Sequence, residues 1–168
     1  LPAAIVAADA AVGRAETLGF RPVLATALRA GLPLLEGFQE VYGESDVGFF
    51  GAMRVEGQGP GADGSVPIAM GYEALPPLRD RTLIIVDPMV ATGSTIVDIH
   101  RRLVEIGQTP SRLIGAGVVG WRGAYERLHA AIPKLELVLA TCDEELNEQG
   151  YIVPGLGDAG DLCFGPKI

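Results

Sequence analysis

The sequence lacks several features that define other classes of protein. No apolar run reaches the ~18 residues of a membrane-spanning helix, and no secretory signal is visible. The only two cysteines, Cys142 and Cys163, form neither a disulfide framework nor a metal-ligand spacing, which favours free thiols in a reducing cytoplasm. The net charge is −8 without any cluster of Lys and Arg, which argues against a nucleic-acid-binding surface. We therefore expect a cytoplasmic protein whose partners include no nucleic acid and no membrane.

The composition otherwise indicates an ordinary globular domain. The 168 residues are 48% hydrophobic and 20% charged, which suits a single domain over residues 1–168 with one substantial core. The first residue is Leu1 rather than Met, so we expect the native N-terminus to be missing from this sequence.

The strongest local pattern predicts a strand, a tight loop and a helix in succession. Branched apolar residues at 83–86 end at Asp87, and small residues follow at 91–95. Apolar residues then recur at helical spacing over 96–106, and Gly107 stands where a left-handed residue ends a helix. The apolar stripe predicts that one face of this helix is buried.

This arrangement predicts an anion site in the loop. The first amides of a helix have no partner within the helix, and its positive dipole end points at whatever the loop encloses. Small residues let a phosphate approach those amides, and Thr92, Ser94 and Thr95 add hydroxyl donors. No Lys follows the glycine as in a Walker A sequence, and the dinucleotide fingerprint GxGxxG is absent. The pattern therefore favours a phosphorylated small molecule as the ligand.

Apolar strands alternate with helical stretches along the rest of the chain. Strands are predicted at 21–28, 111–120 and 135–140, and helices at 1–19, 32–41 and 123–131. Such alternation indicates an α/β fold with a mainly parallel sheet flanked by helices, and ligands at the carboxyl ends of the strands. Residues 151–164 have little periodicity and several glycines, so irregular backbone is expected there.

Three segments resemble known functional blocks of one family. DPMVATGST at 87–95 resembles the phosphoribosyl pyrophosphate (PRPP) loop of type I phosphoribosyltransferases, in the variant typical of uracil phosphoribosyltransferases. LRAGLPLLEG at 28–37 is similar to the pyrophosphate-binding loop of that family, and LNEQGYIVPGLGDAGDLCFG at 146–165 to its uracil-binding segment. The blocks occur in the family's order, so we identify the chain as a member of it, with the type I fold and a flexible hood at about 46–76.

The resemblance implies a role for individual residues. Catalytic roles fall on Asp87, Arg29 and Arg54, the last in the hood between short strands at 46–53 and 66–72. The implied PRPP-binding residues are Arg29, Ala30, Gly31, Arg54, Asp87, Pro88, Met89, Val90, Ala91, Thr92, Gly93, Ser94, Thr95 and Asp158. Within the base-binding segment 150–165, the implied uracil contacts come from Ile152, Gly157, Asp158 and Ala159.

The resemblance also implies the reaction and its partners. The 5-phosphoribosyl group of PRPP would pass to uracil, giving UMP and pyrophosphate in pyrimidine salvage, with no covalent nucleophile. Pro88 stands where most of the family carry a second acid, so Mg²⁺ would be carried mainly by PRPP rather than by protein ligands. Homo-oligomers, dimers or tetramers, are usual in the family.

Two departures from the family pattern leave alternatives open. The turn at 119–123 reads Val-Gly-Trp-Arg-Gly instead of Ala-Ala-Pro-Glu-Gly, so Trp121 lines the base pocket, forms an oligomer contact or is a packed surface aromatic. Met53 and Val55 replace the usual Tyr and acid beside Arg54. The alternatives are a phosphoribosyltransferase for another base or aromatic acceptor, and a non-catalytic sensor of PRPP or nucleotide.

Overall fold

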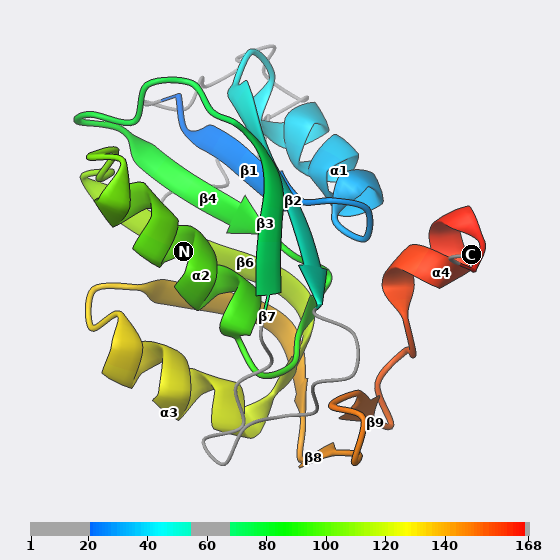
Figure 1. Ribbon diagram of the computed structural model, residues 1–168. Helices are drawn as coiled ribbons and strands as arrows, with labels where there is room; N and C mark the ends of the chain where they lie inside the picture. Colours follow the sequence, from blue (N-terminus) through cyan, green and yellow to red (C-terminus); the bar gives the residue numbers. More distant parts are fainter. Residues whose placement is uncertain (1–20, 55–67, 167–168) are drawn as a thin grey trace, which may run out of the picture.

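The computed structural model describes the backbone of residues 21–54 and 68–166, and the side chains of 21–51 and 71–166 (Figure 1). The helix expected at 1–19 and the central part of the expected hood, 55–67, lie outside the described residues. No helix in the described part of the chain combines the length and apolar character needed to cross a membrane.

A seven-stranded sheet forms the centre of the described structure, in the order β3-β2-β1-β4-β6-β5, with β7 also paired to β6. Every pairing is parallel except that of β2 with β3. Its strands are β1 Val23–Ala27, β2 Asp46–Arg54, β3 Ile68–Ala74, β4 Thr82–Val86, β5 Met89–Val90, β6 Arg112–Trp121 and β7 Glu136–Asp143. The mainly parallel sheet predicted from the sequence is confirmed.

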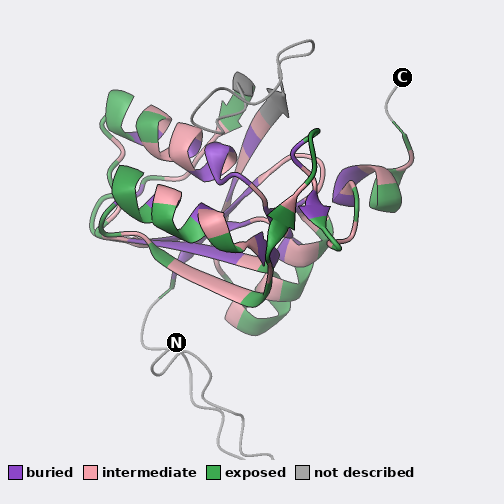
Figure 2. Ribbon diagram, turned by 90° about the horizontal axis from the view of Figure 1, so that it is seen from below, coloured by how far each residue is buried: buried purple, intermediate pink, exposed green. Residues whose placement is uncertain are grey.

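Helices cover both faces of the sheet, because alternate residues of each buried strand point to opposite sides. On one face, Leu24 and Ile84 pack with Leu35 of α1 (Leu32–Tyr42). On the other, β-strand residues such as Leu83 pack against the buried stripes of α2 (Ser94–Glu105) and α3 (Arg122–Ala131). Figure 2 shows the buried strands enclosed between helices whose outer faces are exposed.

The stripe of α2 follows the spacing read from the sequence. Ile96, Ile99 and Leu103 are buried, and burying each such side chain stabilises the fold by about 1.5–3 kcal/mol. Ile106 is the C-cap, and Gly107 has the left-handed φ of 69° expected after the helix. The prediction of an amphipathic helix with a buried face is confirmed.

The C-terminal part of the chain is more regular than its sequence pattern predicts. It forms a small two-stranded sheet, β8 Glu145–Leu146 with β9 Ile152–Val153, and a short helix, α4 Ala159–Phe164. The expectation of irregular backbone is therefore wrong for α4, which Asp158 caps at its N-terminus. In Figure 1, α4 lies to one side of the sheet, near the connection from β1 to α1.

Candidate active site

Two loops leave the same edge of the sheet because β1 and β4 are adjacent and parallel. Residues 28–31 follow β1, and Asp87 follows β4. The two strand ends are tied together: the buried Thr26 hydroxyl donates a hydrogen bond of 2.6 Å to the Val86 carbonyl. The structure thus brings the loop of Arg29 beside the loop of Asp87, at the carboxyl edge where ligands of open parallel sheets bind.

The turn between β1 and α1 fits against this edge only with a glycine. A Cβ on Gly31 would collide with the Thr26 hydroxyl and lie 3.0 Å from the Val86 carbonyl oxygen. The Leu28 amide donates to the Phe50 carbonyl of β2 at 2.8 Å, and the peptide between Leu28 and Arg29 is cis. The close packing at Gly31 and the hydrogen bond from the Leu28 amide therefore hold the backbone of this loop in place.

The first half of the 87–95 loop is held by hydrogen bonds to β6. The Asp87 amide donates to the Ala116 carbonyl at 2.9 Å, and the Pro88 carbonyl accepts from the Val119 amide at 3.0 Å. One carboxylate oxygen of Asp87 accepts from the Met89 amide at 3.0 Å. The residues after Pro88 form β5, a two-residue strand that the sequence pattern did not predict.

The second half of the loop leads directly into α2. Gly93 caps this helix with a left-handed φ of 76°, and a Cβ there would lie 2.7 Å from Leu128. The hydroxyls of Thr92 and Ser94 are buried and lie 2.9 Å apart in a hydrogen bond, while Thr95 is half-buried. The Ser94 amide, the first of α2, donates to the Thr92 hydroxyl at 3.3 Å, so the turn before the helix is tightly packed.

Arg29 extends from the β1–α1 turn to α4. One of its terminal nitrogens, Nη2, donates to Asp161 at 2.9 Å and to the Gly165 carbonyl at 3.1 Å. Its guanidinium carbon lies 5.9 Å from the ring centre of Phe164. Sequence reasoning missed Asp161, although its spacing from Asp158 is the signal of a cap: the Asp158 side chain accepts from the Asp161 amide at 2.9 Å.

The predicted base-binding residues precede and begin α4. Ile152 is buried in β9, and Ala159 is buried in the first turn of α4. Gly157 is exposed with a left-handed φ of 75°. A Cβ on the next helical residue, Gly160, would lie 3.2 Å from the Asp158 carboxylate and 3.8 Å from Ala30. This segment therefore lies beside the turn that carries Arg29.

Arg54 is the last residue of β2, which runs parallel to β1 and continues past the end of β1. Its backbone therefore lies toward the same edge as Arg29. Its side chain and residues 55–67 lie outside the described part of the structure, so its predicted contact with PRPP stays a prediction.

Residues 119–123, expected as a turn, form the end of β6 and the start of α3, and they are tied to the chain just before β8. The Trp121 indole nitrogen donates to the Glu144 carbonyl at 3.0 Å, and Arg122 forms a 2.9 Å ion pair with the Glu144 carboxylate. Trp121 also packs against the apolar cluster beneath α2 and α3. Of the three roles considered for Trp121, these contacts favour a packed aromatic.

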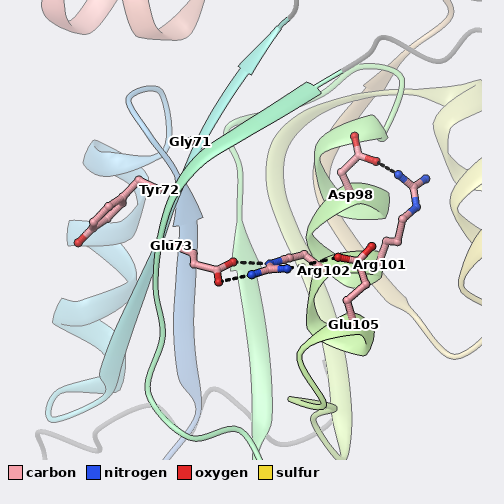
Figure 3. Close-up of a pocket in the computed structure, with 7 residues that line it drawn as sticks. All are labelled: Gly71, Tyr72, Glu73, Asp98, Arg101, Arg102 and Glu105. Atoms are coloured by element: carbon pink, nitrogen blue, oxygen red, sulfur yellow. Dashed lines mark hydrogen bonds and ion pairs between the residues drawn. The ribbon is translucent and has the colours of Figure 1, made fainter.

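A separate hollow of about 570 Å³ lies between β3 and α2 (Figure 3). Arg102 forms a two-point ion pair with Glu73, with both contacts at 2.7 Å, and Arg101 contacts Asp98 at 2.6 Å. The hydrogen bond from Arg102 lowers the pKa of Glu73, and its partner carboxylates raise the pKa of Arg102. None of the described residues that line this hollow belongs to the loops that follow β1 and β4, where the predicted site residues gather.

Neither histidine stands out as a ligand or an acid–base group. Burial lowers the pKa of His100 on α2, and His129 stacks on Tyr125 with ring centres 6.0 Å apart. Within residues 21–54 and 68–166, no group of three or more His, Cys, Asp or Glu side chains is placed to hold a metal ion.

Comparison with solved structures defines the class of fold. The chain is similar to the AQ2163 protein from Aquifex aeolicus, with a TM-score of 0.75 and 32% identity over 87% of this chain and 66% of that chain. It also matches a purine phosphoribosyltransferase from Pyrococcus horikoshii, with a TM-score of 0.51 and 14% identity over 76% of this chain and 80% of that chain. The fold is that of the type I phosphoribosyltransferases, as predicted.

Sequence relatives define the family. The family model for uracil phosphoribosyltransferase matches residues 10–166. The uracil phosphoribosyltransferase of Thermococcus gammatolerans is 42% identical over 147 residues, covering 87% of this chain and 62% of the relative. That of Natronomonas pharaonis is 40% identical over 144 residues, covering 85% and 64% respectively. The chain belongs to the uracil phosphoribosyltransferase family, and it spans less than two thirds of the length of these relatives.

Proposed function

We propose that this protein is a pentosyltransferase that transfers the 5-phosphoribosyl group of PRPP to uracil, giving UMP and pyrophosphate for pyrimidine salvage. The observation that carries the proposal is the convergence of three distant segments at one sheet edge. The Arg29 turn, the 87–95 loop and the segment that begins α4 are joined there through the Thr26–Val86 and Arg29–Asp161 contacts. Family membership supports the same reaction.

In this proposal, the 87–95 loop binds the ribose 5-phosphate part of PRPP. The amides of 91–95 at the N-terminus of α2 bind the 5′-phosphate, with hydroxyl donors from the same residues. Asp87 accepts hydrogen bonds from the ribose hydroxyls, and its own contact with the Met89 amide orients the carboxylate. Pro88, Met89 and Val90 form the wall between these two groups.

The pyrophosphate leaves from the anomeric carbon and gains charge as it does so. Arg29, with the backbone of Ala30 and Gly31, binds that group from the β1–α1 turn, and Arg54 approaches from the hood. A guanidinium suits this task because its planar donors match two phosphate oxygens at once. Catalysis is then mainly positioning and electrostatic stabilisation of the developing charge.

Mg²⁺ accompanies PRPP in this proposal. Asp87 is the acid at the loop, and Pro88 follows it without a second carboxylate. An ion carried mainly by pyrophosphate oxygens and water fits this donor set, since Mg²⁺ commonly keeps several waters and few protein ligands. The bound ion would neutralise part of the pyrophosphate charge.

The acceptor binds against the segment before α4. Backbone groups at Ile152 and at Gly157, Asp158 and Ala159 pair with the donor and acceptor edge of uracil, and Asp158 lies next to PRPP. A rigid set of backbone partners rejects a base with the inverted edge, because buried polar groups would lose their hydrogen bonds. We further propose a cytoplasmic homo-oligomer, a dimer or tetramer.

The test is release of pyrophosphate from PRPP and Mg²⁺ by the purified protein with uracil, other bases and aromatic acids. Uracil-dependent release that Asp87→Asn abolishes and Asp46→Asn leaves unchanged supports the proposal; Asp46 pairs with Arg81 at the opposite end of the strands. If pyrophosphate is released only with another acceptor, that acceptor replaces uracil as the proposed substrate. PRPP binding without release for every acceptor identifies a sensor instead of an enzyme.

A further inference from the structure

The guanidinium of Arg29 is held in one orientation by α4. Nη2 donates both to the Asp161 carboxylate at 2.9 Å and to the Gly165 carbonyl at 3.1 Å, while the Phe164 ring lies 5.9 Å from the guanidinium carbon. Two hydrogen bonds in different directions and an aromatic contact fix the plane of the group as well as its position.

These contacts leave donors for a ligand. Among the described residues, the hydrogen bonds of Arg29 use Nη2. The single N–H of Nε and the two N–H groups of Nη1 therefore stay available to donate to an anion, each from its own edge of the guanidinium, because both paired edges include Nη2. A long side chain loses much rotamer freedom when it binds a ligand. Fixing the guanidinium beforehand removes part of that cost from the binding step.

The helix is anchored by contacts other than those of Arg29. The Asp158 side chain caps it by accepting from the Asp161 amide at 2.9 Å, and Ala159 and Gly160 are buried at its start. This cap uses the backbone of Asp161 and not its carboxylate. Asp161→Ala therefore removes the contact with Arg29 while it preserves the capping hydrogen bond, whereas an Asn would keep an acceptor oxygen for Arg29.

We propose that Asp161 is a positioning residue for Arg29, so that α4 forms part of the pyrophosphate subsite. The inference rests on the proposed function, because it takes Arg29 as a ligand of pyrophosphate. It also predicts the direction in which the affinity for pyrophosphate changes when the Asp161 side chain is replaced. A carboxylate near an anion repels it, so electrostatics alone predicts tighter binding when the charge of Asp161 is removed. Loss of positioning predicts weaker binding. We expect this effect to exceed the loss of repulsion, because the side chains of Arg29 and Asp161 are 37% and 35% exposed and water screens the repulsion there.

The test is a double-mutant cycle on the affinity for pyrophosphate with Mg²⁺, measured by calorimetric titration of the full chain. We expect Asp161→Ala to weaken binding about three- to tenfold. In the Arg29→Gln background the same change should have an effect within about twofold, since Asp161 acts through Arg29. Asp46→Ala, which loses a comparable 2.6 Å ion pair with Arg81, is the matched control and should bind as the unmodified chain does. Thermal unfolding of each variant checks that it is folded.

Three other outcomes overturn the inference. Unchanged or tighter binding by folded Asp161→Ala shows that Asp161 does not position Arg29. If the Asp161 substitution weakens binding equally with and without the Arg29 side chain, Asp161 has a structural role that does not act through Arg29. If the unmodified chain binds no pyrophosphate, both the inference and the proposed function fail. If it binds pyrophosphate but turns over no acceptor, only the proposed function fails, and the cycle still decides the role of Asp161.

Discussion

Thr26 and Val86 join the two strands that carry the candidate site. The Thr26 hydroxyl donates a 2.6 Å hydrogen bond to the Val86 carbonyl, and both residues are fully buried. The next residues on each strand lead to Arg29 and Asp87, so this contact and the parallel pairing of β1 with β4 hold the two loops side by side.

Thr26→Val should therefore destabilise the fold. The substitution leaves the Val86 carbonyl buried without this partner, which costs about 1–3 kcal/mol in the free energy of unfolding. Thr26→Ser keeps the hydroxyl and should lose less. Urea unfolding of both variants measures the difference, and equal losses would show that the hydrogen bond has no part in it.

Gly31→Ala should impair PRPP binding as well as stability. The new Cβ would collide with the Thr26 hydroxyl, so the β1–α1 turn must move away from β4. Gly37→Ala is the matched control, because nothing lies within 4 Å of a Cβ at that position in α1. The control should stabilise the helix by about 0.5–1 kcal/mol and leave PRPP binding unchanged. Titration with PRPP compares them, and equal affinities would contradict the expected movement of the turn.

Gly93→Ala and Gly107→Ala form a second pair. Both glycines have a left-handed φ, 76° and 69°, so an alanine at either position meets a similar backbone cost, of order 1 kcal/mol. At Gly93 the Cβ also meets Leu128 at 2.7 Å, whereas at Gly107 nothing lies within 4 Å. We therefore expect Gly93→Ala to lose more stability than Gly107→Ala, and only Gly93→Ala to lose affinity for PRPP. Similar unfolding curves and affinities for the two variants would refute this.

The Glu73–Arg102 pair should make stability depend on pH. The pKa of Glu73 in the folded protein is below its ordinary value, chiefly because of the hydrogen bond from Arg102. Its contribution is therefore fully present above the pKa of the unfolded chain and is lost as the pH falls through the folded pKa. Glu73→Gln should be slightly less stable than the unmodified chain at pH 7, and this difference should vanish at acid pH. A difference that is constant across denaturant titrations from pH 7 to pH 3 would contradict this linkage.

The sequence predicted those parts of the structure that rest on local periodicity. Residues 83–86 and 96–106 have the apolar spacing of a buried strand and an amphipathic helix, and both are seen as β4 and α2. The left-handed Gly107 also follows from the local pattern. These features depend on residues that are close together in the sequence, within one helix turn or one strand. A local sequence pattern can therefore predict them.

Contacts between distant segments could not be read in the same way. Asp161 contacts Arg29 only because α4 lies beside the β1–α1 turn. The helix α4 has six residues and follows a glycine-rich segment, so the sequence pattern did not indicate it. Met89 and Val90 likewise form β5 only because they pair with β6, which is distant in sequence. Their own sequence shows no strand pattern. Where the side chain of Arg54 lies is still a prediction.

The most direct test of the account is formation of UMP from uracil, PRPP and Mg²⁺, followed by chromatography, for the unmodified chain, Arg29→Gln, Asp87→Asn and Asp46→Asn. We expect UMP from the unmodified chain and from Asp46→Asn, and a rate reduced at least about 100-fold in the other two variants. UMP formation at an undiminished rate by folded Arg29→Gln or Asp87→Asn would contradict the claim that the loops joined by Thr26 and Val86 form the active site.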